Sequence, residues 1–161
     1  MIFFTADEHY GHTNIIKYCD RPFASAEEMD AEIIKRHNEV VGENDIVYHL
    51  GDFTMKGTDK AEVYIMRLNG KHVFINGSHD YWNKNLKDII ELKVNDKYLV
   101  LCHYPMRSWP RSFHGSIQLF GHCHGSMKPE GKQMDVGVDT NDFYPYSLEQ
   151  IISIMKNYEN K

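Results

Sequence analysis

Cysteine is scarce in this chain of 161 residues and is not arranged to form a framework. The three cysteines, Cys19, Cys102 and Cys123, are odd in number, and none belongs to a Cys-x-x-Cys pair. A disulfide scaffold and a structural zinc site built on paired thiols are therefore not predicted. This use of cysteine is typical of a reduced setting, so we expect a cytoplasmic protein.

Long apolar runs are also missing. No stretch approaches the roughly 20 apolar residues of a membrane-spanning helix. The opening segment Met1–Thr5 lacks a basic region, and the acidic Asp7 follows too soon for a signal peptide. We therefore expect no membrane partner.

Positive charge is in deficit, because 18 Lys and Arg residues face 23 Asp and Glu residues, for a net charge of −5. A broad basic surface for duplex nucleic acid is therefore not expected. A phosphate substrate is not excluded, since two bound divalent cations would reverse the sign of the charge locally. The chain shows no linker, repeat or low-complexity segment, and its length suits one domain over residues 1–161. The oligomeric state is left open.

Histidine, by contrast, is abundant, with ten residues. Five of them stand at predicted strand ends or in the loops just beyond, namely His9, His79, His103, His122 and His124. The stretch Tyr48–Phe53 shows the pattern: the apolar run 46–48 predicts a buried strand, Gly51 permits a sharp turn, and Asp52 follows. Open α/β sheets bind their ligands at such carboxyl ends, so these side chains are expected to meet at one rim.

The order of predicted elements indicates the fold class. Strands are predicted at 2–6, 46–48, 72–75, 116–120 and 132–138, and a hairpin at 92–94 and 97–102. Helices are predicted at 25–42 and 61–68, with a short helical piece at 15–19 and a closing helix that begins near Ser147. Ser25 with Glu28, and Ser147 with Gln150, predict capping boxes. A parallel first half and a more antiparallel second half predict an α/β protein of two packed sheets with helices outside.

The candidate ligands are carboxylates and imidazoles. Asp7 and His9 lie two residues apart, so in an extended chain they point the same way and can bind one ion together. Asp52, in the middle of the set, could be shared by two ions. This mixed donor set suits Mn, Fe, Zn or Ni in a catalytic centre. The alternative is that the histidines are separate packing or capping residues, an interpretation that fits any single one better than the whole set.

The ordered set as a whole resembles the calcineurin-like metallophosphoesterase family. The motifs that carry the resemblance are Asp7-x-His9, Gly51-Asp52, Gly77-x-His79-Asp80, His103 and Gly121-His122-x-His124. Further matches at Asn14–Ile16 and Val136–Asp139 resemble a small uncapped bacterial and phage branch, so the resemblance covers nearly the whole chain. It implies a four-layer α/β/β/α double-sheet sandwich.

The resemblance also implies two divalent metal ions and a role for each motif. The implied ligands are Asp7, His9 and His124 for the first ion, His103 and His122 for the second, and Asp52 for both. His79 would stand near the scissile phosphate and protonate the leaving oxygen. Asp80 would orient His79, as a carboxylate does for an imidazole.

One position departs from the family pattern. The family has Asn between the Gly and the His of its third motif, as a ligand of the second metal, whereas Ser78 is the candidate ligand here. A serine hydroxyl is shorter than a carboxamide and a poorer donor to a divalent cation. Asn76 lies two residues earlier, and whether it substitutes is open. The second site is therefore expected to be weak.

These residues predict a metal-dependent phosphoesterase that hydrolyses phosphodiester or phosphomonoester bonds of small phosphoesters or nucleotides. Two cations about 3.5–4 Å apart would neutralise the non-bridging oxygens and turn a shared water into hydroxide. Mn²⁺ is expected first, with Fe, Zn, Ni and Mg as the other candidates. The alternative is a non-catalytic binding or scaffold protein of the same fold with an impaired second metal site.

Three arginines complete the candidate site. Arg21, Arg107 and Arg111 lie in predicted loops that could face the metals. An arginine fork suits phosphate oxygens, so all three are candidates for substrate binding. The alternative for each is a solvated surface side chain.

Overall fold

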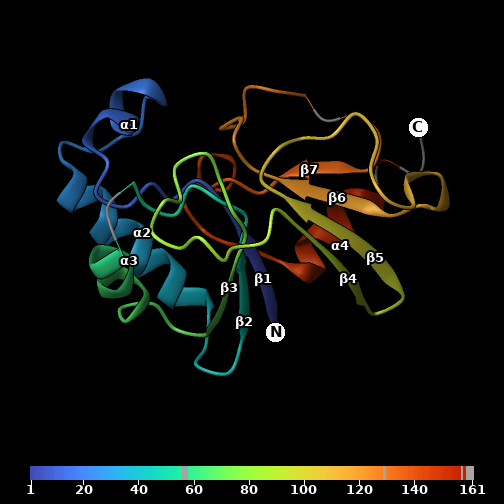
Figure 1. Ribbon diagram of the computed structural model, residues 1–161, viewed down its shortest axis with the longest axis horizontal. Coiled ribbons are helices and arrows are strands. Elements are labelled where there is room, and N and C mark those ends of the chain that lie inside the picture. Colours follow the sequence, from blue (N-terminus) through green and yellow to red (C-terminus); the bar gives the residue numbers. More distant parts are fainter. Residues whose placement is uncertain (56–57, 129, 157, 159–161) are drawn as a thin grey trace.

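Two four-stranded sheets form the centre of the computed structural model, which describes residues 1–55, 58–128, 130–156 and 158 (Figure 1). The first sheet has the order β3-β2-β1-β8, with β1 at Ile2–Thr5, β2 at Ile46–His49, β3 at Lys71–Phe74 and β8 at Tyr146–Ser147. The second has the order β4-β5-β6-β7, with β4 at Ile89–Val94, β5 at Lys97–Cys102, β6 at Ile117–Phe120 and β7 at Gln133–Asp135. The predicted α/β double-sheet class is confirmed.

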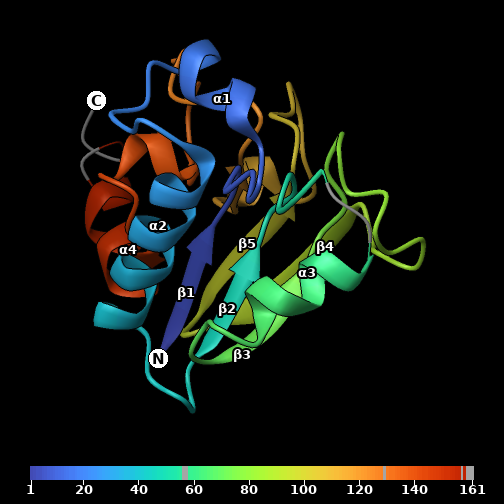
Figure 2. The same cartoon turned by 90° about the vertical axis from the view of Figure 1, so that its left-hand side faces the viewer.

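Helices cover the first sheet and close the sandwich. They are α1 at Thr13–Tyr18, α2 at Ala26–Val40, α3 at Thr58–Ile65 and α4 at Leu148–Lys156, with short 3₁₀ turns η1 at Ser112–His114 and η2 at Val138–Thr140. Figure 2 shows α2 and α3 in front of β1 and β2, and α1 beyond the ends to which these strands point. The helix α4 contacts β8 and β1, and its apolar residues join the core between the sheets.

The two predicted capping signals act as expected. Ser25 Oγ accepts the Glu28 N–H at 3.1 Å, while the Glu28 carboxylate accepts the N–H of Ala24, one residue before the cap. At α4 the exchange is reciprocal, because Ser147 Oγ accepts the Gln150 N–H at 3.2 Å and Gln150 Oε1 accepts the Ser147 N–H at 2.8 Å. Such side chains satisfy amide groups that the first helical turn leaves unpaired.

The last turn of α2 carries a histidine with a structural role. His37 is buried, and its Nε2–H donates to the carbonyl of Asn69 at 2.9 Å. Burial lowers the pKa of His37 to about 3, so the imidazole is neutral in the folded protein near pH 7. This contact ties α2 to the loop that enters β3.

The prediction of a more antiparallel second half is wrong beyond the hairpin. Among the described residues of the second sheet, β4 and β5 pair antiparallel, whereas β5 with β6 and β6 with β7 are parallel. The antiparallel edge of the first sheet is β8, two residues long and not predicted. The third helix also ends at Ile65, three residues earlier than expected. Parallel pairing in both sheets places many strand carboxyl ends on one side of the molecule.

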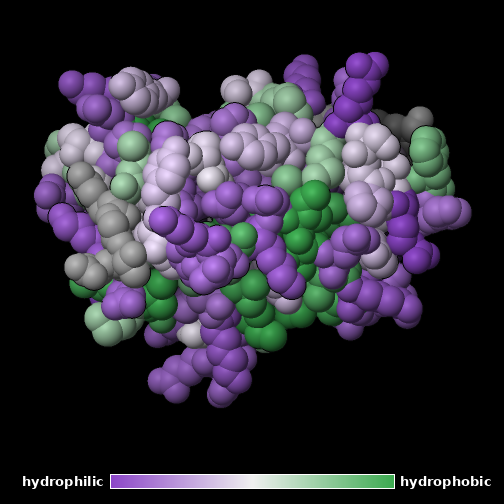
Figure 3. Space-filling view, in the orientation of Figure 1, coloured by the Kyte–Doolittle hydropathy of each residue, from purple (hydrophilic) through white to green (hydrophobic). Residues whose placement is uncertain are grey.

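The two sheets touch at that side. Ala6 and Gly137 form an isolated parallel bridge, and the Val138 N–H donates to the Ala6 carbonyl at 3.0 Å. Figure 3 shows hydrophilic side chains over much of one face of the molecule and an apolar area near the middle of the view. No helix among the described residues is long and apolar enough to cross a membrane.

Candidate metal centre

The loops that follow the strands carry the predicted ligands in an unusual backbone conformation. Five of these residues have a left-handed φ between 47° and 68°, namely Asp7, His9, Asp52, His122 and His124. Such a φ is uncommon for residues other than glycine and costs energy that the surrounding structure must offset. The turns aim successive side chains into the space where the two sheets meet.

The first group of candidate ligands is Asp7, His9 and His124. One ligand atom from each lies within 4.8 Å of the others. Asp7 is fully buried, and its carboxylate accepts the backbone N–H of His122 at 2.9 and 3.0 Å. The rings of His9 and His124 stack with centroids 5.3 Å apart.

The second group is Asp52, His103 and His122, again with ligand atoms within 4.8 Å of one another. The Nδ1–H of His103 donates to the Leu50 carbonyl at 2.8 Å, which turns its Nε2 lone pair toward Asp52 Oδ2, 3.4 Å away. The same Oδ2 lies 3.6 Å from His9 Nε2. Asp52 therefore lies between the two groups, where a bridging carboxylate must be.

The residues fit a pair of divalent cations. His9 Nε2 and His103 Nε2 are buried and have no hydrogen-bond partner among the described residues, which is costly unless a ligand fills the gap. Burial, then the carboxylates of Asp52 and Asp135, raise the pKa of Asp7 well above its usual value. Buried negative charge and orphaned imidazole nitrogens are what a cation would satisfy.

Asp52 keeps its charge in this setting. Burial opposes ionisation, but the imidazole of His103, whose Nε2 lies 3.4 Å away, the imidazole of His9 and the N–H of His79 together hold the pKa of Asp52 well below its usual range. Burial, more than any other cause, lowers the pKa of His9 to about 3, against the opposing charge of Asp52. Near pH 7 the site thus presents an ionised carboxylate beside a neutral imidazole, the protonation states that bind metal.

A carboxylate that sequence reasoning gave no role orients His124. The Nδ1–H of His124 donates to Asp139 Oδ2 at 2.7 Å, which leaves Nε2 free toward the first group. Asp139 is itself held by Arg21, whose Nε and guanidinium nitrogen donate at 2.8 and 2.7 Å. Metal-ligating histidines are commonly fixed by such partners. The signal was available, because Asp139 follows the last long predicted strand.

The predicted substrate role of Arg21 needs correction. Its side chain is fully buried, and it also donates to the backbone carbonyls of Asp7 and Glu8 at 2.7 and 3.1 Å. Because its donors serve the protein, Arg21 braces the first ligand loop. Arg111 stacks over the ring of Tyr98, which lies about 16 Å along β5 from His103 at 3.3 Å per residue. Arg107 is exposed on the loop after His103, and its substrate role stays a prediction.

The third motif divides into two roles. The backbone N–H of His79 donates to Asp52 Oδ1 at 2.8 Å, and its half-buried ring lies 5.6 Å from that of His9, centroid to centroid. Ser78 Oγ donates to the same carboxylate at 3.0 and 3.2 Å, so its hydroxyl is at the edge of the second group. Its role as a ligand stays a prediction.

The prediction that Asp80 orients His79 is not supported. Both oxygens of Asp80 are occupied: they accept the N–H groups of Asp52, Phe53 and Gly77 and the indole N–H of Trp82, at 2.7–3.0 Å. Asp80 therefore fixes the loop that presents Asp52. Its carboxylate acts as a structural brace for the shared ligand, and its hydrogen bonds run to the backbone and the indole in place of the His79 ring.

Three glycines let the loops approach one another. A Cβ added to Gly77 would lie 2.3 Å from the Asp52 nitrogen, and one on Gly121 would lie 2.6 Å from Asp7 Oδ2. At Gly51, with φ +93°, it would lie 2.5 Å from His103 Nδ1. No side chain tolerates such distances, so glycine is required where these loops pack against one another.

Comparisons with known proteins identify relatives in sequence and in structure. No family model matches the chain. The uncharacterised protein MJ1445 of Methanocaldococcus jannaschii is 36% identical over 164 residues, which cover 96% of this chain and 91% of that protein. The crystal structure of AQ665, a protein of unknown function from Aquifex aeolicus, has a TM-score of 0.75 at 24% identity and covers 96% of this chain and 98% of its own.

A more distant structural similarity links the chain to a protein of known fold. A double mutant of Vps29 from Entamoeba histolytica has a TM-score of 0.50 at 16% identity, covering 84% of this chain and 72% of that one. Vps29 has the calcineurin-like metallophosphoesterase fold, and so does this chain. At these identities the structures show the fold alone.

Proposed function

We propose that this chain, which belongs to the same family as MJ1445 of Methanocaldococcus jannaschii, is a dinuclear metal-dependent phosphodiesterase. The substrate class is a small phosphoester or nucleotide, and Mn²⁺ is the preferred ion among Mn, Fe, Zn, Ni and Mg. The proposed setting is the cytoplasm, where the free thiols of Cys19, Cys102 and Cys123 would persist.

One observation carries the proposal: Asp52 Oδ2 lies between two orphaned imidazole nitrogens, 3.6 Å from His9 Nε2 and 3.4 Å from His103 Nε2. Each nitrogen belongs to its own group of three ligands. A structural metal site has one closed ligand set, whereas a shared carboxylate between two open sets favours a pair of catalytic ions.

When bound, two divalent cations would supply neutralisation of the phosphate charge and an activated water. Asp7, His9 and His124 would hold the first, His103 and His122 the second, with Asp52 shared. The chain supplies the orientation: the Leu50 carbonyl fixes the tautomer of His103, and Asp139 fixes that of His124. Neither ligand then has to reorganise when substrate arrives.

His79 is the proposed general acid. Its backbone is anchored to Asp52, and its half-buried ring lies 5.6 Å from the ring of His9, centroid to centroid, beside the first group of candidate ligands. The alkoxide of a phosphodiester is a poor leaving group unless a proton is donated to its oxygen. An imidazole side chain can donate that proton. The proton would pass from the His79 ring to the leaving oxygen.

A second candidate function rests on Ser78. Its hydroxyl donates to the Asp52 carboxylate, so the second group contains no amide oxygen at this position. A chain with a weakened second site could bind phosphoesters without hydrolysing them. This alternative predicts metal binding and phosphate binding with no turnover.

An activity assay with and without each divalent ion distinguishes the phosphodiesterase from the binding protein. Purified protein would be stripped with a chelator and assayed with a generic diester and monoester before and after addition of each divalent ion. We expect no turnover without metal and restoration by Mn²⁺ above the other ions. Full diester turnover after exhaustive chelation would refute the metal mechanism, and metal uptake without turnover under any ion would favour the binding protein.

A further inference from the structure

A basic pocket lies on the outer face of the second sheet, away from the candidate metal centre. It has a volume of about 400 Å³, and its cationic side chains are Lys93, Lys97, Arg111 and Lys132. The carboxylates nearby are Asp96, which lines it, and Glu91, which accepts a hydrogen bond from Tyr98. Four permanent positive charges therefore gather in one concavity of a chain whose net charge is −5.

Three of these cations are not used to pair with carboxylates of the protein. Among the ion pairs between described residues, none involves Lys93, Lys97 or Arg111. Lys93 alternates along β4 with the core-facing Leu92 and Val94, so it stands on the outward face of the sheet. Like charges brought together in this way repel one another, and a bound anion would remove that repulsion.

The Arg111 guanidinium lies over an aromatic ring in a position from which it can bind an anion. Its guanidinium carbon lies 4.9 Å from the centre of the Tyr98 ring. Stacking uses the flat face of a guanidinium and leaves its N–H groups, which point outward in the plane, free to donate to phosphate oxygens. The residue also adopts a left-handed backbone, φ +60°, at the start of η1. The contact with the Tyr98 ring therefore orients the guanidinium before any ligand arrives.

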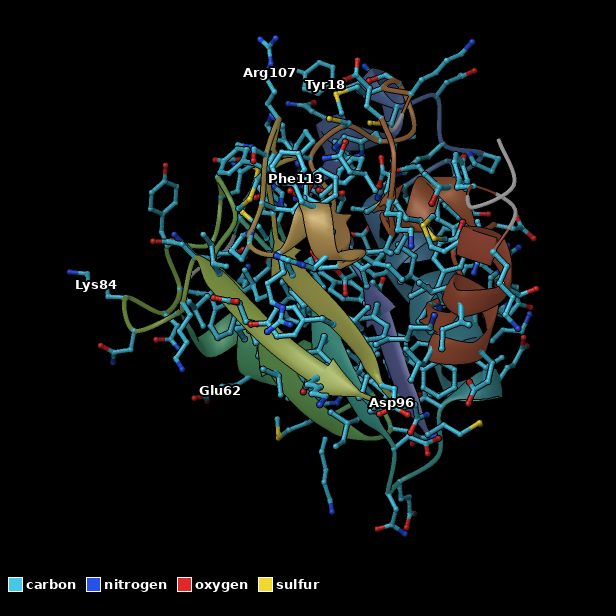
Figure 4. All side chains as sticks on the ribbon, turned by 90° about the vertical axis from the view of Figure 1, so that its right-hand side faces the viewer. Tyr18, Glu62, Lys84, Asp96, Arg107 and Phe113 are labelled. Atoms are coloured by element: carbon cyan, nitrogen blue, oxygen red, sulfur yellow. The ribbon has the colours of Figure 1, made fainter. Side chains whose placement is uncertain are left out.

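The loop that connects the metal end of the sheet to this pocket offers stacking surfaces. It begins with Tyr104, which is 46% exposed, and includes Phe113, which is 97% exposed. Figure 4, which views this side of the molecule, shows Arg107 and Phe113 on the same loop region above the β4–β5 hairpin. Exposed aromatic rings interleaved with cations are the surface that unpaired bases and their phosphates recognise.

We propose that the basic pocket binds a phosphate of a single-stranded oligonucleotide. The rest of the strand would run along the loop of residues 104–116 toward the metal centre. The pocket begins beside Tyr98, about 16 Å along β5 from His103. One nucleotide cannot touch both places, whereas a strand of several can. The placement of the strand's other end at the metal centre rests on the proposed phosphodiesterase function, but the pocket's affinity does not.

Binding is tested first without hydrolysis. Fluorescein-labelled oligothymidylates would be titrated into the full chain in the presence of a chelator, with anisotropy as the readout, at several salt concentrations. The variants are Lys93→Gln and Arg111→Gln, singly and together, with Arg111→Lys as a conservative change. The matched control is Lys35→Gln, an exposed lysine on α2.

We expect the double variant to bind at least about tenfold more weakly, the weight of one charge-assisted hydrogen bond. The slope of log affinity against log salt should fall by about 0.7 for each phosphate that the variant no longer neutralises. Lys35→Gln should bind as the unaltered chain does. Equal weakening in the control and the pocket variants would overturn the proposal, as would inorganic phosphate binding with no gain for the oligonucleotide.

A second arm tests the connection to the metal centre. With Mn²⁺ present, the KM for oligothymidylates should fall with length in the unaltered chain and fall less steeply in Lys93→Gln, while turnover of a small chromogenic diester stays equal in both. If nothing is hydrolysed, the proposed phosphodiesterase fails and the binding arm still decides the pocket. If small diesters are hydrolysed but length has no effect, the proposed path of the strand is wrong.

Discussion

Replacing Ser78 with asparagine should strengthen the second metal site. The first group has three ligands of its own plus the shared Asp52, whereas the second has two histidines plus Asp52. The Ser78 hydroxyl does not add a strong donor, because it points its proton at the Asp52 carboxylate at 3.0 and 3.2 Å. Asparagine would bring a carboxamide oxygen farther into the same space.

The expected change in metal affinity can be estimated from the typical contribution of one ligand to metal binding. Loss of even an outer partner typically changes metal affinity by about 10–100-fold, which is about 1.4–2.7 kcal/mol. A gained direct ligand should tighten the second site by at least that much, and diesterase activity at limiting metal should rise with it. The first site, whose ligands are unchanged, serves as the internal reference.

The assay is a metal titration of both proteins, followed by calorimetry and by turnover in parallel. In the unaltered chain one equivalent should bind tightly and the second only at higher concentration. Ser78→Asn should bring the two binding steps together. Two equal steps in both proteins, with equal rates, would refute the reasoning and show that Ser78 or another donor already completes the second site.

Two further predictions concern histidines. His79→Ala should keep its backbone hydrogen bond to Asp52, so the metal content found by elemental analysis should not change. Turnover should fall by about 10²–10⁴-fold. Loss of metal along with activity would make His79 a ligand. Burial lowers the pKa of His37 to about 3 from an ordinary 6.5, so as pH falls below 6.5 the unfolded chain takes up a proton that the folded chain does not. Stability should therefore be full above pH 6.5 and decline toward acid, with His37 contributing a loss of about 2 kcal/mol at pH 5. His37→Gln should flatten the urea-unfolding profile by that amount, and an unchanged acid slope would contradict it.

Sequence reasoning brought the candidate ligands together because their signal is local. A polar residue directly after a buried strand, repeated at Asp7, Asp52 and His103, predicts convergence whenever the strands are parallel. The capping boxes of α2 and α4 were found for the same reason, since their partners lie three residues apart. Structural features whose partners lie within a few residues of each other can be predicted from the sequence alone.

The errors lie where partners are distant in sequence. Arg21 pairs with Asp139 118 positions away, and Asp80 bonds to backbone groups 27 and 28 positions away, so neither partner is marked by a pattern around the residue. Strand direction is likewise invisible to alternation of apolar and polar residues, which is why the parallel pairing of β5, β6 and β7 was missed. A two-residue strand such as β8 carries no periodic signal at all.

Both ligand groups draw side chains from both sheets. Asp7 and His9 follow β1 of the first sheet, while His124 follows β6 of the second. The second group is divided in the same way, with Asp52 from the first sheet opposite His103 from the second. Bound ions would therefore link the two sheets at the end of the sandwich where Ala6 and Gly137 already form a bridge between them. Because binding to the folded state alone adds about 2.7 kcal/mol at a hundred times Kd, metal supply would set how firmly the two halves of the molecule stay joined.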